Sequence, residues 1–211
     1  MKLIIQLAFL LLLSCSGKDT SKEIQTKIVG IIPYDGISKF EVAEISKTIE
    51  NFYKIETQIL PSNVLPQQAF VNIKSPRFRA DSIIRIQNRN RVDSLDFIMG
   101  LTSKDISVTK NDKDGNILKP TWKYNDFGVM GLAYRPGTSC IISKFRLKNK
   151  DKLLEFERFK KVVIHEFGHN LGLPHCPNKH CVMTSAAEKI STIDNEKMEL
   201  CEECKTLLGW N

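Results

Sequence analysis

The sequence has no low-complexity tract, and glycine and proline occupy only 11 and 8 of its 211 residues. These features exclude a collagen-like chain, a repeat protein and a mostly disordered protein. The sequence also lacks a long hydrophobic run: its most apolar segment, residues 3–13, is shorter than the roughly 20 residues that a membrane-spanning helix needs. What remains is a globular chain whose length, at about 100–200 residues per domain, predicts one compact domain.

The first residues have the pattern of a secretory leader rather than of a folded domain. Lys2 precedes the short apolar segment, and small residues follow it. The residues Leu-Leu-Ser-Cys at 12–15 resemble a bacterial lipobox, in which the cysteine is acylated and becomes the new N-terminus. We therefore expect a lipoprotein signal peptide at residues 1–14, lipidation of Cys15 and a polar tether over residues 15–25. The alternative is an ordinary signal peptide with an incidental cysteine.

This leader predicts a location in the bacterial cell envelope, with a single domain over residues 26–211 anchored to the membrane by the lipid at Cys15. The net charge of the whole chain is +7, but its lysines and arginines are spread along the sequence without a basic stripe interleaved with aromatics. A solvated basic surface is the better interpretation, and no nucleic-acid partner is expected. The sequence does not determine the oligomeric state, and a monomer is expected.

Hydrophobic periodicity predicts alternating strands and helices in the domain. Strands are expected at residues 26–33, 55–60 and 95–101, and helices at residues 39–53, capped by Ser38, at 80–87 and at 152–171. Loops are expected around Pro61, Pro66 and Pro76 and over the polar residues 102–119. Two apolar runs, 128–134 and 139–145, flank a Pro-Gly loop and predict an antiparallel hairpin. The order of elements predicts an α/β or α+β fold with one sheet.

The long helix at 152–171 carries a pattern of metal ligands. His165 and His169 are four residues apart, so both imidazoles can reach one ion, and Glu166 lies beside the first. Gly172 can adopt a positive φ and end the helix, which turns the chain back toward the ion at His175. Two histidines on a helix are often only surface or packing residues, but this extended spacing is specific. Three neutral imidazoles leave one tetrahedral position for water, which predicts a catalytic zinc site.

A cysteine pattern continues this motif. After the third histidine come Cys176, Cys181 and Met183, and then the CxxC pair Cys201 and Cys204. The whole string, HExxHxxGxxHC followed by C-x-M and CxxC, closely resembles the archaemetzincin family of zinc metallopeptidases, which belongs to the metzincin clan. The strong resemblance covers residues 157–204, and a weaker one covers residues 131–137.

The resemblance implies a function for each residue of the motif. It implies His165, His169 and His175 as ligands of the catalytic zinc, Glu166 as the general acid and base, and Met183 as the Met-turn residue beneath the metal. It also implies a second, structural zinc held by Cys176, Cys181, Cys201 and Cys204, hence two zinc ions per chain. The implied fold is α+β, with a twisted mixed sheet, an antiparallel edge strand along the cleft, two long helices and a zinc-bound C-terminal subdomain. The lipoprotein leader departs from the family, whose members are mostly intracellular.

Several alternatives stay open in the sequence. In an oxidising envelope the four cysteines could pair as disulfides, although their CxxC spacing favours zinc. Met183 could be a plain core residue. Cys140, in an expected strand, is interpreted as a small buried core residue, and His180 as a surface histidine.

The expected reaction is hydrolysis of a peptide bond in a peptide or protein substrate. In this hypothesis a zinc-activated water attacks the carbonyl while Glu166 accepts its proton and then donates it to the leaving amine. Extended substrate is expected to add to the edge strand near residues 128–134 by main-chain hydrogen bonds. The rival hypothesis is a zinc-dependent binding or regulatory lipoprotein with little turnover. The presence of Glu166 argues against the rival, because zinc binding alone needs only the histidines.

Overall fold

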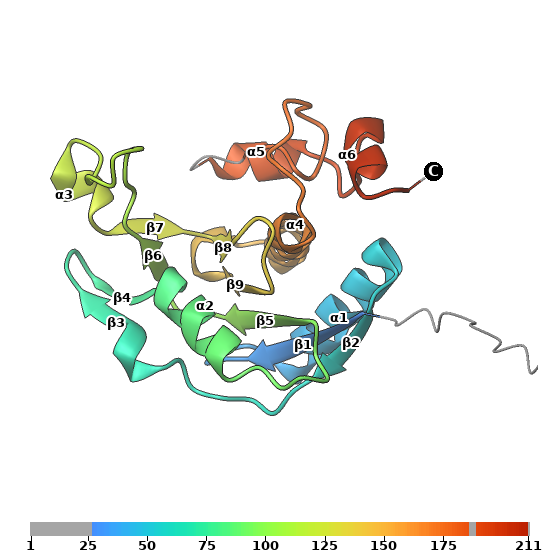
Figure 1. Cartoon of the computed structure of the whole chain (residues 1–211), viewed down its shortest axis with the longest axis horizontal. Helices are drawn as coiled ribbons and strands as arrows, with labels where there is room; N and C mark the ends of the chain where they lie inside the picture. Colours follow the sequence, from blue (N-terminus) through green and yellow to red (C-terminus); the bar gives the residue numbers. More distant parts are fainter. Residues whose placement is uncertain (1–26, 186–188, 211) are drawn as a thin grey trace, which may run out of the picture.

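The computed structural model describes residues 27–185 and 189–210. The expected signal peptide, Cys15 and the tether therefore lie outside the described residues. The chain forms two sheets, with helices on both faces of the larger one (Figure 1). Among the helices of the described residues, none has the length and apolar composition needed to cross a membrane.

The larger sheet has five strands in the order β2-β1-β5-β9-β8. Four of them run parallel, namely β1 (Ile28–Pro33), β2 (Glu56–Ile59), β5 (Phe97–Thr102) and β9 (Ser139–Ser143). The fifth, β8 (Gly131–Ala133), is antiparallel to β9 and forms one edge. The two strands β5 and β9 are buried along their whole length. The expected mixed sheet with an antiparallel edge strand is confirmed.

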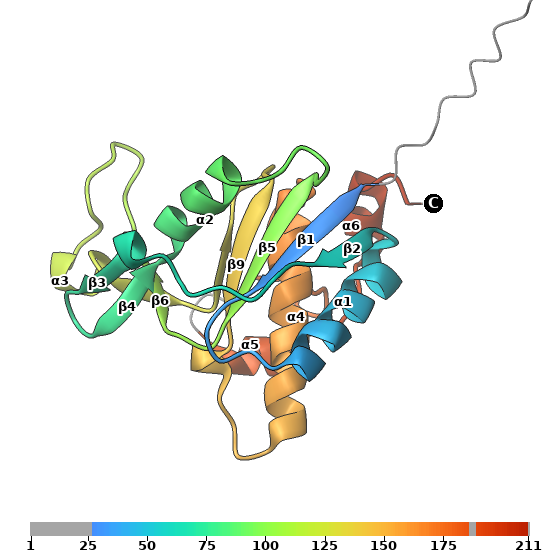
Figure 2. The same ribbon diagram turned by 90° about the horizontal axis from the view of Figure 1, so that it is seen from below.

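Three helices cover the two faces of this sheet (Figure 2). Helices α1 (Lys39–Tyr53) and α4 (Lys152–Asn170) pack on one face, where Ile31 and Met99 belong to their core. Helix α2 (Ala80–Arg89) packs on the other face against Ile32 and Ile141. Successive strand residues point to opposite faces, so β1 contributes to both cores. The two long helices α1 and α4 are those predicted from the sequence, and α1 begins with the expected cap at Ser38, here a full capping box with Glu41.

A second sheet was not predicted. It has the strand order β3-β4-β6-β7, with β3 (Phe70–Asn72), β4 (Pro76–Arg79), β6 (Ile106–Val108) and β7 (Phe127–Val129). Short helical turns, η1 (Gln67–Ala69) and α3 (Thr121–Tyr124), lie in the connections. The expectation of a single sheet was therefore wrong, and so was that of loops where the short strands lie, at residues 70–72, 76–79 and 106–108, whereas residues 60–66 and 109–119 belong to no named strand or helix, as expected. Strands of three or four residues hold too few side chains for an alternating pattern to stand out.

The predicted hairpin was half correct. The later residues of the first run, 128–134, form β8 and pair with β9, with Gly131 opposite Ile142. The earlier residues of that run belong to β7, which pairs with β6 in the second sheet. The chain changes sheet at Met130, so β7 and β8 follow one another as edge strands of two different sheets (Figure 1). The short turn η2 (Phe145–Leu147) precedes α4. After α4 come two short helices, α5 (Ile190–Asn195) and α6 (Glu202–Leu207).

Candidate metal centre

The three predicted histidine ligands converge at the C-terminal end of α4. The Nε2 atoms of His165 and His169, one helical turn apart, are 3.1 Å from each other. The ring of His175 lies with its centroid 5.3 Å from that of His165 and 4.8 Å from that of His169. Gly172, with φ +101°, turns the chain back after the helix, as expected from the sequence. The ligand atoms of the three histidines all lie within 4.8 Å of one another, which suits one shared ion.

Main-chain carbonyls orient the two helical imidazoles. The Nδ1 of His165 is 2.8 Å from the carbonyl oxygen of Val182, and the Nδ1 of His169 is 2.8 Å from that of Leu173. A carbonyl oxygen only accepts, so each Nδ1 carries the proton and each Nε2 keeps a free lone pair. The sequence motif gave no sign of these two carbonyls, because any residue type supplies one.

The histidines are also held in the neutral form. Burial lowers the pKa of His165 to about 3, and the neighbouring His169 adds to the effect. Burial likewise lowers the pKa of His169 and of His175, with Arg135 as a lesser cause in both. A neutral imidazole offers its lone pair to a metal without first losing a proton, so the site is prepared for a cation at neutral pH.

Glu166 lies between α4 and the edge strand β8. A Cβ atom added at Gly131 would stand 2.5 Å from the Glu166 Cγ and 2.7 Å from its Oε1, so a larger residue there would force the Glu166 side chain to shift. The side chain is buried, and burial raises the pKa of Glu166 to about 8. Gly131 is a site residue that the sequence reasoning missed, although the weaker family resemblance of residues 131–137 marked its position.

The four predicted cysteines form a second cluster, on the C-terminal side of the histidines. The sulfur of Cys176 is 3.5 Å from that of Cys201, and the sulfur of Cys181 is 3.8 Å from that of Cys204. All four are free thiols. A disulfide would need about 2.05 Å, whereas four sulfurs about 2.3 Å from one zinc are spaced about 3.8 Å apart. The donor set and its spacing fit a four-thiolate zinc site and do not support the disulfide alternative.

Residues 176–184 connect the two clusters. The N–H of Met183 donates to the Cys181 sulfur at 3.5 Å, and the N–H of Cys176 donates to the carbonyl of Met183 at 2.8 Å. Met183 is fully buried, and a Cβ added at Gly168 of α4 would stand 2.5 Å from its sulfur. Met183 therefore packs directly against the helix between the two histidine ligands. Of the remaining predictions, Cys140 is buried and His180 is exposed, as expected.

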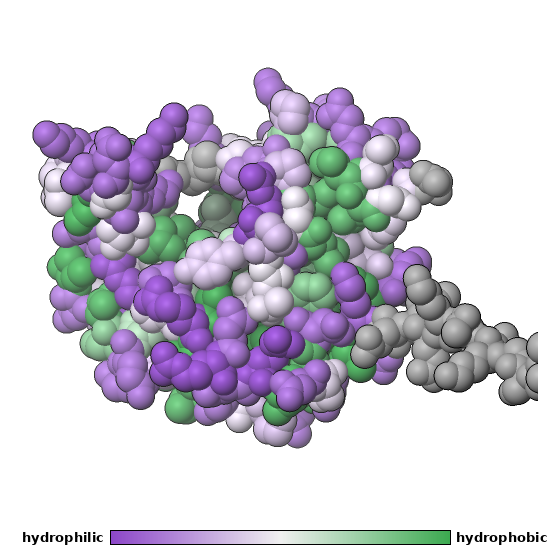
Figure 3. Space-filling view, in the orientation of Figure 1, coloured by the Kyte–Doolittle hydropathy of each residue, from purple (hydrophilic) through white to green (hydrophobic). Residues whose placement is uncertain are grey.

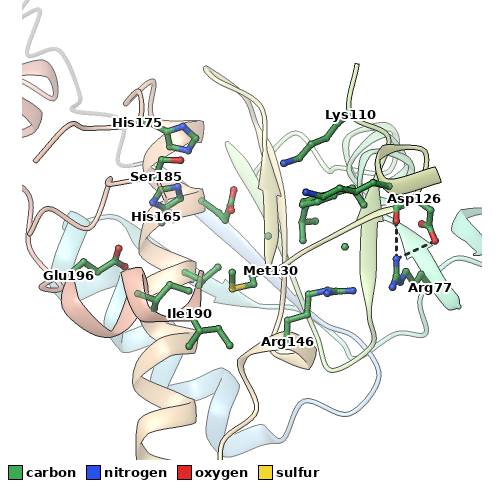
Figure 4. Close-up of a pocket in the computed structure, with 18 of the residues that line it drawn as sticks. Arg77, Lys110, Asp126, Met130, Arg146, His165, His175, Ser185, Ile190 and Glu196 are labelled. Carbon is green, nitrogen blue, oxygen red and sulfur yellow. Dashed lines mark hydrogen bonds and ion pairs between the residues drawn. The ribbon is translucent and has the colours of Figure 1, made fainter. Parts of the chain in front are cut away.

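His165 and His175 line a cleft of about 600 Å³. One wall comes from α4 and α5, and the other from β7, β8 and the second sheet (Figure 4). The hollow between the α3 region and the C-terminal part of the chain is visible on the surface (Figure 3). The second sheet, its connecting segments and η2 contribute five basic residues to the cleft lining, namely Lys74, Arg77, Lys110, Lys123 and Arg146. From the sequence, the basic residues were expected to be dispersed over a solvated surface. The grouping of these five in one cleft was not predicted, because they come from separate segments.

Comparison with known proteins identifies the family of the chain. The family model described as "Peptidase family M54" matches residues 21–209. The archaemetzincin of Haloquadratum walsbyi is 28% identical over 190 residues, covering 86% of this chain and 99% of that protein. The archaemetzincin of Methanopyrus kandleri is 30% identical over 147 residues, 70% of this chain and 74% of the relative.

Solved structures show the same fold. The crystal structure of the Methanopyrus kandleri archaemetzincin superposes with a TM-score of 0.71 at 24% identity, covering 90% of this chain and 97% of that one. The archaemetzincin of Archaeoglobus fulgidus superposes with a TM-score of 0.68 at 24% identity, covering 85% and 99%. The mixed sheets and the helices described above are thus shared with both proteins.

Proposed function

The chain belongs to peptidase family M54 and is a zinc metallopeptidase, and from that premise we propose that Glu166 is its general base and acid beside a zinc held by His165, His169 and His175. The observation that carries the proposal is the convergence of three neutral imidazoles, two of them oriented by main-chain carbonyls, next to a buried carboxyl group. Such a donor set suits a catalytic zinc, since three ligands leave one position open. When bound, zinc supplies Lewis acidity, which lowers the pKa of water to about 7 and polarises a carbonyl group.

Glu166 moves the proton. Burial alone raises the pKa of its carboxyl group to about 8, and a cation held by the neighbouring histidines would lower it again, because an opposite charge favours the carboxylate. The carboxylate takes a proton from the attacking water and then gives it to the departing amine. The close approach of Gly131 holds the carboxyl group against β8, the strand along which this proposal has the substrate run.

The substrate is a peptide or protein in extended form. One edge of strand β8 pairs with β9. On its other side, residues of β7 and β8 line the cleft. An extended chain adds to such an edge by main-chain hydrogen bonds, which bind any sequence of side chains. This arrangement supports the placement of the scissile bond between Gly131 and the histidines.

Cys176, Cys181, Cys201 and Cys204 hold a second, structural zinc in this proposal, giving two ions per chain. Four sulfurs complete a tetrahedral site and leave no position for water, so the second ion stabilises residues 176–204 rather than taking part in the chemistry. Met183, packed against Gly168, forms the Met-turn floor below the histidines.

The proposal places this peptidase in the bacterial cell envelope as a lipoprotein. It rests on the leader pattern of residues 1–14, on Cys15 directly after it and on the polar residues 15–25 as a tether. The folded unit is then a monomeric domain over residues 26–211.

Substitution Glu166→Gln tests the central claim. Glutamine keeps the shape of the side chain but does not accept a proton, so peptide hydrolysis should fall by ~10²–10⁴-fold while zinc content and Tm stay at wild-type values. The matched control is Glu157→Gln, an exposed acid on the same helix, which should leave hydrolysis unchanged. Wild-type hydrolysis by Glu166→Gln would reject Glu166 as the base.

A further inference from the structure

A buried acid lines the cleft next to the metal centre. Glu196 directly follows α5, lines the same cleft as His165 and is only 4% exposed. Its Oε2 is buried and has no hydrogen-bond partner among the described residues. Burial without a partner opposes ionisation and raises the pKa of Glu196 to about 8. Buried polar groups are normally paired within the fold, so this carboxyl group is available to a group from outside the chain.

Lys161 of α4 is the cation that acts on Glu196, but its ammonium group is bound to main-chain atoms. Its Nζ donates to the carbonyl oxygen of Ile193 at 2.7 Å and to the main-chain carbonyl oxygen of Glu196 at 2.5 Å. Its charge favours the carboxylate form of Glu196, but less strongly than burial opposes that form. The acid of α5 itself, Asp194, is bound by two N–H groups of Arg158 at 2.7 and 2.8 Å, so it does not compete for a cation in the cleft.

Apolar side chains line the cleft beside Glu196. Those from α4 and α5 are Val162, Ile190 and Ile193. Val162 lies three residues before His165 on α4, so the two side chains are neighbours on one face of the helix. Figure 4 shows Ile190 and Glu196 on the same side of the cleft as His165, with Met130 on the other side. The space next to His165 is thus apolar along its walls and has a carboxyl group at one end.

The position of Glu196 along α4 shows how far a substrate group has to reach. Its main-chain carbonyl is bound by Lys161, which lies four residues before His165. At 1.5 Å per residue, these two positions of α4 are about 6 Å apart along the helix axis. A substrate residue beside His165 therefore needs a long side chain with an apolar stem and a polar head, and Lys and Arg have this form. An α-amino group has no such stem, so a side chain suits this site better than the N-terminus of a substrate.

We propose that Glu196 determines the specificity of this peptidase by binding the cationic head of a Lys or Arg side chain at a substrate residue next to the cleaved bond. The inference rests on the proposed function, in which His165 holds the zinc beside which the bond is cleaved. The stem of the substrate side chain packs against the apolar residues of α4 and α5, and its head gives the carboxylate the partner that the fold does not supply. A buried site of this kind discriminates against a neutral side chain, because its own carboxyl group then stays unpaired.

The test compares peptides that differ in one side chain. Each peptide is blocked at both ends and carries Lys, Arg, Glu or norleucine at one position around a fixed cleavage site, and kcat/KM is measured with the full chain and zinc bound. Norleucine has the stem of lysine without its charge. At one position next to the cleaved bond, Lys and Arg should raise kcat/KM about tenfold over norleucine, mainly through KM, and Glu should lower it. A second arm gives the norleucine peptide a free N-terminus, which tests an α-amino group as the source of the cation.

Variants of Glu196 then assign the preference to its carboxyl group. Glu196→Gln should cleave the Lys and norleucine peptides equally well, and Glu196→Asp, which keeps the charge, should retain part of the preference. Each ratio of kcat/KM is measured within one variant, so a change in folding or in zinc content cancels. The matched control is Glu199→Gln, which makes the same charge change at an exposed side chain three residues further on and should keep the full preference. Zinc content and Tm verify that each variant is folded.

Equal cleavage of the Lys, Arg and norleucine peptides at every position would overturn the proposal. A gain that comes only from the free N-terminus would also overturn it, because the cation would then not be a side chain. A preference for Lys that survives unchanged in Glu196→Gln would overturn the assignment to Glu196. None of these results would affect the proposed hydrolysis, because cleavage of the neutral norleucine peptide measures that separately.

Discussion

The imidazole Nδ1 of His165 lies 2.8 Å from the carbonyl oxygen of Val182, the residue between Cys181 and Met183 in the chain. One peptide segment thus orients a histidine of the first cluster and carries a sulfur of the second. The N–H groups of Met183 and Cys201 both donate to the Cys181 sulfur, at 3.5 and 3.4 Å. If the segment around Cys181 moves, the Val182 carbonyl moves with it, and His165 loses the group that orients its ring.

This relationship predicts that damage to the cysteine cluster weakens metal binding at the histidines. Wild-type protein should contain two zinc ions per chain. Cys181→Ser should lose one of them and bind the other about 10–100-fold more weakly, as is typical when a partner that orients a ligand is lost. Zinc content and competition with a chelator measure both effects. Cys140→Ala, a buried cysteine outside the cluster, should keep both ions, and an unchanged affinity of the remaining ion in Cys181→Ser would show that the two sites are independent.

Features that depend on residues close together in the sequence were predicted, whereas features that depend on contacts between distant segments were not. Helix α4 and its two histidines follow from a local period of 3.6 residues, and Gly172 and His175 from fixed offsets, so all of these were found. The second sheet was missed, because its three- and four-residue strands are stabilised by contacts between distant segments, such as Arg77 with Asp105 and Asp126.

The same reasoning explains which parts of the site were missed. Ligand side chains are visible as residue types, whereas the carbonyls of Val182 and Leu173 are main-chain groups present at every position. The pairing of Gly131 with Glu166 and of Gly128 with Arg146 depends on tertiary packing between residues far apart in sequence. The sequence shows that each glycine lies in an apolar run, but it does not show which side chain packs against that glycine.

The close packing of β8 on α4 predicts a strong effect for Gly131→Ala. The added methyl group would stand 2.5 Å from the Glu166 Cγ, so the carboxyl group has to move. A shift of about 1 Å at a reacting group typically costs about 10²-fold, so hydrolysis should fall by that order while zinc content stays at two per chain. Steady-state kinetics and metal analysis on the same sample measure this. Hydrolysis at the wild-type rate would show that Glu166 does not depend on its contact with Gly131.

The proposed lipoprotein leader makes a prediction about location that is independent of the chemistry. Cys15→Ala should prevent lipidation and move the protein from the membrane fraction to the soluble one, because stable anchoring takes at least two acyl chains and the described helices offer no span. Fractionation with and without detergent, together with the mass of the N-terminal peptide, measures the outcome. Cys140→Ala serves as the matched control and should stay in the membrane fraction. Membrane association of Cys15→Ala would exclude the lipobox.

Glu196 predicts a pH dependence of stability. The residue is 4% exposed, its Oε2 has no hydrogen-bond partner among the described residues, and burial raises its pKa from an ordinary 4.5 to about 8, with Lys161 as a lesser cause in the opposite direction. An acid with a raised pKa in the folded state holds its proton there, so its contribution to stability is complete below pH 4.5 and is lost as the pH rises toward 8. The loss is at most about 1.4 kcal/mol per pH unit in this window.

Glu196→Gln should remove this loss, because glutamine has no proton to release. With zinc saturating, the Tm of wild type and variant should agree near pH 5, and the variant should become the more stable of the two by several degrees between pH 7 and 9. Other titrating groups are common to both proteins and cancel in the difference. Glu157→Gln, at an exposed position of α4, should follow the wild-type curve at every pH. A constant difference between Glu196→Gln and wild type from pH 5 to 9 would mean that Glu196 is ionised in the fold throughout, with a partner that compensates its burial.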